Sequence, residues 1–442
     1  MAKIKKIQDY DWRYSLLRRF VDRAIRHSYR NIKYVGMERV PTDGAVIYAP
    51  NHTGTLMDAL VILSMDRKPK VFVARADIFK NPKLAKLFRF FKIMPIMRMR
   101  DGFDEVKKNN KTIKDATDVL RDKVPFCIFP EGTHQTKYSL LPLSKGIFRI
   151  ALQAKEMMPD MPLYIVPVGI RYGSFWRFRA SARVQIGEPM EVGEFITNNP
   201  DKTNAELMNI MRASLDERMK ESVFYIPNDE NYKATYEICA AALEPQVEKL
   251  GKTNEYSHLR GGEACFVANN MTVKQLADIK NEKPELAEKL FALGNEASKM
   301  RKAKRISLKS VSMKRSLLLQ MARLLLLVVA IPYAMSVSLF VSPVNLLLHV
   351  IFKKFKDQAF RNSLRFLMNL LLWPLLLVIY AVIAFCLLPW QWALLLLVLL
   401  SPAPRVMHDV YKSVRMIVSD FRLRASKSLK AKYQEIRTLL FN

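Results

Sequence analysis

Short apolar runs alternate with longer, helix-like stretches through the first half of the chain. The apolar runs cover residues 46–48, 71–74, 93–97, 126–129, 163–168 and 182–186. Stretches with helical patterning lie between them, at 58–64, 82–91, 104–121 and 145–155. Strands that alternate with helices predict a central, mostly buried sheet flanked by helices, which is the α/β class. Catalytic groups in such folds gather on loops at the strand ends.

Helical patterning also marks the start of the chain and the region after Pro189. Trp12, Leu16 and Phe20 recur at helical spacing, while arginines take the opposite side. This pattern fits a helix lying in a membrane interface and an ordinary surface helix equally well. Farther along, a Thr-x-x-Glu capping box at 203–206 and a Thr-x-x-Gln box at 272–275 predict helix starts. We therefore expect a helical accessory region over residues 201–315.

Two long apolar stretches follow, at 324–352 and 366–402, and prolines interrupt both. A helix needs about 20 apolar residues to cross a membrane. One crossing by each stretch would place the basic connector at 353–365 on the far side of the membrane, although basic segments tend to stay in the cytoplasm. Two helical hairpins, re-entrant or spanning, keep every basic flank cytoplasmic, and we favour them over buried core helices of a soluble domain.

These patterns divide the chain into five segments. No secretory signal is visible before the α/β segment. We expect a membrane protein whose α/β domain lies on the cytoplasmic face. The segments are an amphipathic N-terminal helix at 1–33, an α/β domain at 34–200, the helical accessory region at 201–315, membrane-embedded hairpins at 316–405 and a basic C-terminal helix at 406–442.

The net charge limits the kinds of partner that the protein can bind, and the cysteine spacing bears on its redox state. Lys and Arg number 71 against 41 acidic residues, a net charge of +30 over 442 residues, so the surface attracts anions. The apolar stretches with basic flanks favour anionic membrane lipids, and no helix-turn-helix or aromatic-interleaved basic strand supports nucleic acid. The four cysteines show no CxxC pairing and are interpreted as reduced. No His/Cys/Asp cluster has metal-ligand spacing, so we expect neither a metal nor a bound cofactor.

Candidate chemistry begins where the first apolar run ends. The stretch AVIYAPNHTGTLMD at 45–58 puts His52 at a strand exit and Asp58 at the start of a helix-like run. A carboxylate that holds one imidazole nitrogen protonated leaves the other as a base for an alcohol proton. The alternative is a helix-capping aspartate beside a structural histidine.

Two further strand exits carry groups suited to phosphate. After the run at 126–129 comes Pro130-Glu131-Gly132-Thr133-His134, followed by LPLSKG at 141–146. Gly132 allows close backbone approach to a ligand, Thr133 offers a hydroxyl, and Lys145 begins a helix whose N-terminal N–H groups favour an anion. Arg98 follows the run at 93–97 and could clamp phosphate. The alternatives are a turn in which Glu131 caps backbone donors and a solvated arginine.

Taken in order, these motifs resemble the glycerolipid acyltransferase family, which includes glycerol-3-phosphate and 1-acylglycerol-3-phosphate acyltransferases. The ordered set is His52 with Asp58, an arginine after a strand, FPEG, and a strand ending in VPV at 166–168; the resemblance covers roughly residues 34–189. Five residues separate His52 from Asp58 where four are usual, and His134 replaces the usual arginine after FPEG. Both departures resemble the yeast-type glycerol-3-phosphate acyltransferase branch.

The resemblance implies a membrane-bound enzyme that moves a fatty acyl group from acyl-CoA or acyl-carrier protein to a hydroxyl of glycerol 3-phosphate or 1-acylglycerol 3-phosphate in phospholipid synthesis. It implies that His52 is the general base and Asp58 its orienting partner. The residues implied to hold the phosphorylated acceptor are Arg98, Glu131, Gly132 and Thr133, with Lys145 nearby. A non-catalytic, membrane-associated scaffold with a degenerate acyltransferase domain is the alternative.

Overall fold

The computed structural model describes residues 6–97, 109–355 and 357–442. Contacts divide the chain into two compact units. The sheet unit comprises Met1–Val223 with Leu348–Trp373, and the helical unit comprises Phe224–Leu347 with Pro374–Asn442. The connector at 353–365 therefore belongs to the sheet unit, although the sequence places it between the two apolar stretches.

The sheet unit is built on an eight-stranded sheet with the order β1-β7-β6-β2-β5-β3-β4, and β8 pairs with β6. All pairs are parallel except β6 with β7 and β6 with β8. Each of the six predicted apolar runs contains a strand, and the sequence patterning missed the edge strand β1 and the short β8. The strands are β1 Asn31–Val35, β2 Ala45–Pro50, β3 Val71–Arg75, β4 Ile93–Ile96, β5 Phe126–Cys127, β6 Leu163–Tyr172, β7 Ser181–Ile186 and β8 Met190–Glu191.

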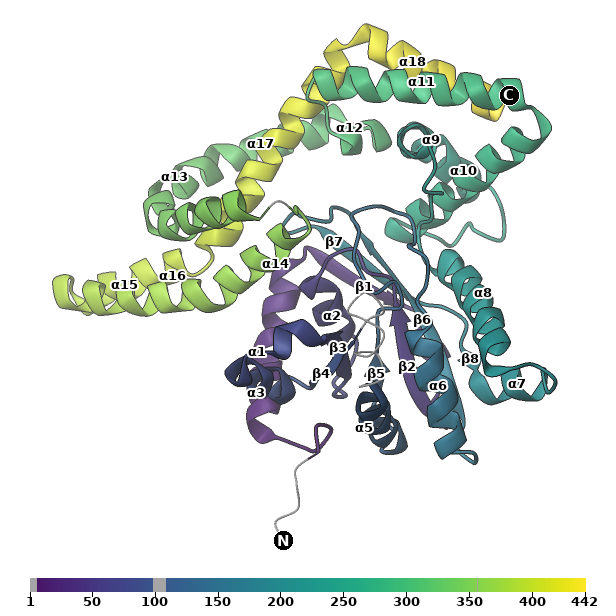
Figure 1. Ribbon diagram of the computed structural model, residues 1–442. Coiled ribbons are helices and arrows are strands. Elements are labelled where there is room, and N and C mark those ends of the chain that lie inside the picture. Colours follow the sequence, from purple (N-terminus) through teal and green to yellow (C-terminus); the bar gives the residue numbers. More distant parts are fainter. Residues whose placement is uncertain (1–5, 98–108, 356) are drawn as a thin grey trace. The chain divides into compact units, whose positions relative to one another are not determined.

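Helices cover both faces of this sheet, as Figure 1 shows. They are α1 Trp12–Ser28, α2 Leu56–Leu63, α3 Pro82–Phe90, α5 Asn109–Arg121, α6 Gly146–Met157, α7 Val192–Thr197, α8 Asn204–Ser222 and α14 Phe360–Leu367, with 3₁₀ turns η1 Met37–Arg39 and η2 Ala76–Phe79. The central strand β2 is buried along its whole length. A strand covered on both faces has to be apolar at every position, which explains its unbroken apolar run.

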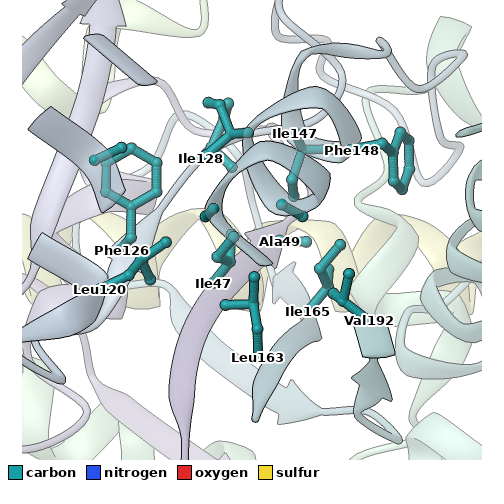
Figure 2. Packing of buried hydrophobic residues seen from close by; sticks show 14 of the residues in the cluster. Ile47, Ala49, Leu120, Phe126, Ile128, Ile147, Phe148, Leu163, Ile165 and Val192 are labelled. Atoms are coloured by element: carbon teal, nitrogen blue, oxygen red, sulfur yellow. The ribbon is translucent and has the colours of Figure 1, made fainter. Parts of the chain in front are cut away.

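Side chains of β2 alternate between two hydrophobic clusters. Ile47 and Ala49 face one cluster, shown in Figure 2, to which α5, α6 and α8 contribute. Val46 and Tyr48 face the other, to which α1, α2 and Phe366 of α14 contribute. The α/β architecture predicted from the alternating pattern is confirmed, and it leaves the exit of β2 between two packed layers.

The helical unit consists of long helices that pack around a hydrophobic cluster and a buried polar contact. Arg301 pairs with Glu237 at 2.7 Å, and the Tyr433 hydroxyl donates to the same carboxylate at 2.6 Å. Because Glu237 is buried, both donors are needed to offset its desolvation. The helices are α9 Tyr232–Gly251, α10 Gly262–Glu282, α11 Pro284–Ala303, α12 Leu308–Ser312, α17 Ala403–Ala425 and α18 Lys427–Phe441.

Of the two predicted capping boxes, one is confirmed and one is wrong. Thr203 and Glu206 cap α8 reciprocally. Thr272 instead lies inside α10, where its hydroxyl donates to the Ala268 carbonyl at 2.9 Å. A threonine hydroxyl can bond to a carbonyl one turn back, so the Thr-x-x-Gln pattern also occurs in helix interiors.

The apolar stretches form two helical runs that are long and apolar enough to cross a membrane, Leu317–Lys354 and Phe360–Leu387. The first stretch, for which we predict a hairpin, is one continuous helix, α13 Leu317–Lys354, which is visibly curved in Figure 1; the path of this stretch through a membrane stays a prediction. Its two internal prolines, Pro332 and Pro343, each remove one backbone hydrogen bond, which bends a helix without ending it when apolar residues continue on both sides.

The second apolar stretch does reverse direction. After α14 come the π-helical turn η4 Met368–Leu372, α15 Trp373–Leu387 and α16 Trp390–Leu400. Helix α15 ends before Pro389, and Ala384 of α15 lines the same apolar cavity as Leu396 of α16. The two short helices therefore lie against each other.

Candidate active site

The imidazole of His52 and the carboxylate of Asp58 form a hydrogen-bonded pair at the exit of β2. Nδ1 of His52 lies 2.7 Å from Oδ2 of Asp58. The same oxygen accepts the backbone N–H groups of Thr53 at 2.8 Å and Gly54 at 2.7 Å. The other oxygen, Oδ1, accepts the Tyr172 hydroxyl at 2.7 Å. Asp58 is fully buried while 19% of the His52 side chain is exposed, so the imidazole alone reaches solvent.

The loop between β2 and α2 has room for this arrangement only because position 54 is a glycine. A Cβ at Gly54 would lie 2.7 Å from Oδ1 of Asp58 and 2.9 Å from the Tyr172 ring. Thr55 adopts a left-handed backbone conformation with φ of 53° and turns the chain into α2. Asn51 fixes the other end of the loop, because its side-chain amide exchanges hydrogen bonds with the backbone of Ile170 at 2.6 and 3.1 Å.

The FPEG loop after β5 holds the dyad from the other side. Oε1 of Glu131 accepts the His52 backbone N–H at 2.7 Å, and Oε2 accepts the Leu141 N–H at 2.9 Å. The Phe129 ring stacks on the His52 ring with centroids 4.3 Å apart. Burial raises the pKa of the Glu131 carboxyl to about 7, opposed by its two backbone hydrogen bonds. Both carboxylate oxygens are therefore engaged in positioning the chain.

Of the residues suggested for phosphate binding, all but Arg98 lie in the part of the chain that the structure describes. Gly132 and Thr133 are exposed on the FPEG loop, where Gly132 has a φ of +64°. Lys145 is also exposed and immediately precedes α6, beside the FPEG loop because the Ser144 N–H donates to the Pro130 carbonyl at 2.7 Å. Arg98 lies outside the described residues. Glu131 caps backbone donors, as the alternative interpretation has it, since backbone N–H groups bind both of its carboxylate oxygens.

The structure adds residues from the connector that the sequence did not suggest. Oδ2 of Asp357 lies 2.7 Å from Nε2 of His134, whose ring contacts the His52 ring edge-on at 5.6 Å. The Ser363 hydroxyl lies 2.7 Å from the Thr55 hydroxyl. The sequence signals only that a polar connector at 353–365 separates two apolar stretches. This signal does not say what the connector residues contact.

Tyr172 and Tyr29 also escaped the sequence interpretation. Their rings stack with centroids 5.7 Å apart and planes at 14°. Burial, followed by the negative charge of Asp58, raises the pKa of Tyr172 well above its usual range, so this hydroxyl stays protonated and donates. Tyr29 comes directly after α1, and Tyr172 is the last residue of β6. Neither residue belongs to a recognisable sequence motif, and only the fold brings them to Asp58.

Two other chemistries find little support among the described residues. No group of three or more His, Cys, Asp or Glu side chains within 6–97, 109–355 and 357–442 could hold a metal ion. Cys127 is buried in β5, and burial raises the pKa of its thiol, which disfavours the thiolate that a nucleophile requires. The site thus offers a partly exposed imidazole whose orientation is fixed by Asp58.

Comparison with known proteins identifies an acyltransferase domain in this part of the chain. Residues 31–171 match the family model described as Acyltransferase. Glycerol-3-phosphate O-acyltransferase 2 of Saccharomyces cerevisiae is 32% identical over 28% of this chain and 18% of its own length. The chloroplastic 1-acyl-sn-glycerol-3-phosphate acyltransferase BAT2 of Brassica napus is 29% identical over 30% of this chain and 37% of its own length.

A solved structure is also similar in part. The crystal structure of the 1-acyl-sn-glycerophosphate acyltransferase PlsC from Thermotoga maritima is 20% identical, with a TM-score of 0.34 over 47% of this chain and 78% of that chain. The chain spans less than half the length of the yeast and Brassica relatives that it matches. The family match includes the whole His52–Asp58 loop and the FPEG loop. Residues 31–171 therefore carry a domain that matches the Acyltransferase family and is similar to glycerol-3-phosphate and 1-acylglycerol-3-phosphate acyltransferases.

Proposed function

We propose that this protein transfers a fatty acyl group from the thioester of acyl-CoA or acyl-carrier protein to a hydroxyl of glycerol 3-phosphate or 1-acylglycerol 3-phosphate. The observation that carries the proposal is the His52–Asp58 pair, with a buried carboxylate bonded to Nδ1 and a partly exposed ring. Because Asp58 occupies Nδ1, Nε2 is the nitrogen left to accept a proton. A degenerate scaffold would have no need of this fully satisfied dyad.

The reaction follows from that geometry. Nε2 of His52 removes the proton of the acceptor hydroxyl as its oxygen attacks the thioester carbonyl carbon. The C–O bond forms, the C–S bond breaks, and the imidazolium returns the proton to the departing sulfur. Asp58 stabilises the imidazolium that exists between these two steps, and a well-placed general base contributes about 10²–10⁴-fold to such a rate.

The acceptor phosphate would be held by the cationic and donor groups around the FPEG loop. Gly132 and Thr133 are exposed there, and Lys145 at the start of α6 adds positive charge. Arg98 joins this set from the family resemblance. Fixing the phosphate places the hydroxyl in front of His52, which converts an encounter between two molecules into an oriented reaction.

The test is to give the purified full chain each acceptor with labelled acyl-CoA and with acyl-carrier protein, and to identify the lipid product. Transfer to a phosphorylated glycerol that disappears in His52→Ala supports the proposal. Equal rates with glycerol and glycerol 3-phosphate would remove the phosphate site from it. No transfer in the wild type with either donor contradicts the proposed function.

We further propose that the protein binds anionic lipids from one side of the membrane only. Within the sheet unit, Asn362, Ser363 and Phe366 are buried against the acyltransferase domain, so the connector shares its side. Within the helical unit, α17 and α18 pack on α9, α11 and α12. No helix described before Leu317 is long and apolar enough to cross a membrane.

Chain continuity then places both ends of each apolar stretch on the same side. Helix α13 and the α15–α16 pair therefore enter the membrane and return. The 11 residues of α16 reach about 17 Å, little more than half of a hydrocarbon core of about 30 Å. The flanks are basic, which favours the cytoplasmic face. These flanking residues are Lys314, Arg315, Lys353, Lys354, Arg361, Arg365 and Arg405.

Single cysteines introduced at Lys314, Gln358 and Lys430 test this arrangement in sealed vesicles, in a background where the native cysteines are replaced. A membrane-impermeant maleimide should label all three from the same side. Labelling of Lys314→Cys and Gln358→Cys from opposite sides would show that α13 crosses the bilayer. Detergent-solubilised protein provides the control for total reactivity.

A further inference from the structure

The connector reaches the catalytic carboxylate through a chain of buried side chains. Nδ2 of Asn362 donates to the Tyr29 hydroxyl oxygen at 3.3 Å. Asn362 is 2% exposed and Tyr29 is 1% exposed, although 333 positions separate them in the sequence. The Tyr29 ring stacks on the Tyr172 ring with centroids 5.7 Å apart, and the Tyr172 hydroxyl donates to Asp58 at 2.7 Å.

The two hydrogen bonds at the ends of this set have a fixed direction. An ionised carboxylate only accepts, so the Tyr172 proton points at Asp58. The Asn362 N–H only donates, so the Tyr29 hydroxyl oxygen accepts it. Asp58 also accepts from Nδ1 of His52.

We propose that Asn362 is a positioning residue of the active site, acting on the His52–Asp58 dyad through Tyr29 and Tyr172. The inference rests on the proposed function and deepens it, because it assigns a part of the membrane connector to the dyad. The Asn362 amide fixes the Tyr29 side chain, the Tyr29 ring stacks on Tyr172, and the Tyr172 hydroxyl holds the Asp58 carboxylate in one orientation toward the imidazole.

A packing role for Asn362 is the competing explanation, and one substitution separates the two. Asn362→Leu keeps the number and branching of the side-chain heavy atoms but cannot donate a hydrogen bond. The other amide atom, Oδ1, has no hydrogen-bond partner among the described residues, so leucine sacrifices only the bond to Tyr29. If Asn362 serves packing alone, the leucine variant should be as active as the wild type.

The kinetic test compares Asn362→Leu, Tyr29→Phe and the double variant in the full-length protein. We expect each single variant to lower kcat by about three- to tenfold, the effect of losing one neutral hydrogen bond, with KM for both substrates unchanged. We expect the double variant to be no slower than the slower single one, because either change breaks the same chain. Gln358→Leu, on an exposed connector position, is the matched control and should retain full activity.

A spectroscopic readout keeps the inference separate from the activity. In protein labelled with ¹⁵N-histidine, the Nδ1 proton of His52 should give a downfield resonance that Asp58→Asn shifts. Asn362→Leu and Tyr29→Phe should shift it too, and Gln358→Leu should not. Unchanged resonances would overturn the inference. So would a double variant whose loss of kcat is the product of the two single losses. A wild type without transfer activity whose resonance still responds would keep the inference and remove the proposed function.

Discussion

Replacing Asp58 by asparagine separates the charge of this residue from its shape. Three N–H donors point at Oδ2, from His52 and the backbone of Thr53 and Gly54, so the asparagine oxygen should occupy that place. Its NH₂ group then faces the Tyr172 hydroxyl, whose oxygen can accept. The variant should therefore fold and keep the His52 tautomer, and lose only the negative charge.

The size of the effect follows from what that charge does. During transfer His52 becomes positive next to Asp58, at an N–O distance of 2.7 Å. Two unit charges about 4 Å apart attract by about 4 kcal/mol at an effective dielectric constant of about 20. At 1.36 kcal/mol for each factor of ten, kcat should fall by about 10³-fold. KM should change little, because Asp58 is fully buried and does not reach the substrates.

The assay is steady-state transfer with saturating acyl donor, alongside thermal unfolding to confirm that the variant is folded. Tyr172→Phe is the matched comparison, since it removes one donor to Asp58 but keeps the carboxylate, and it should cost about tenfold or less. A folded Asp58→Asn variant within tenfold of the wild type would refute the role of the charge. So would equal losses in Asp58→Asn and Tyr172→Phe.

Three further predictions address the residues around the dyad. Glu131→Gln puts an NH₂ group against a backbone N–H and should lower kcat about tenfold. Burial raises the pKa of Glu131 from 4.5 to about 7, so the contribution of this residue to folding stability is greatest below pH 4.5 and falls as the pH rises to about 7. Unfolding curves of the glutamine variant, measured across this pH range, should lack this fall. Arg98→Ala should raise KM for the phosphorylated acceptor with kcat unchanged, since a phosphate clamp acts on the ground state and transition state alike; a fall in kcat alone would contradict it. Gly54→Ala should destabilise the protein by about 1–3 kcal/mol because its Cβ would lie 2.7 Å from Asp58, whereas Gly251→Ala, with nothing within 4 Å, should be neutral or stabilising in thermal unfolding.

The α/β core and the dyad were predictable because their signals are local. A buried parallel strand has to be apolar throughout, and β2 shows this in six consecutive residues. His52 and Asp58 lie six positions apart, so one loop is enough to join them. The same locality explains the confirmed capping box at Thr203. The failure at Thr272 has the opposite cause, since the Thr-x-x-Gln pattern does not state whether a helix begins there or continues.

By itself the sequence determined the class of fold, the acyltransferase motifs and the two apolar stretches, because each is written in neighbouring residues. Only the tertiary structure decided that both oxygens of Glu131 bind backbone N–H groups and that Tyr29, Tyr172 and Asn362 stand behind Asp58. Those contacts join segments up to 333 positions apart. The free energy that makes them comes from burying the sheet and α14 together, and no local pattern records which distant partner fills a buried site.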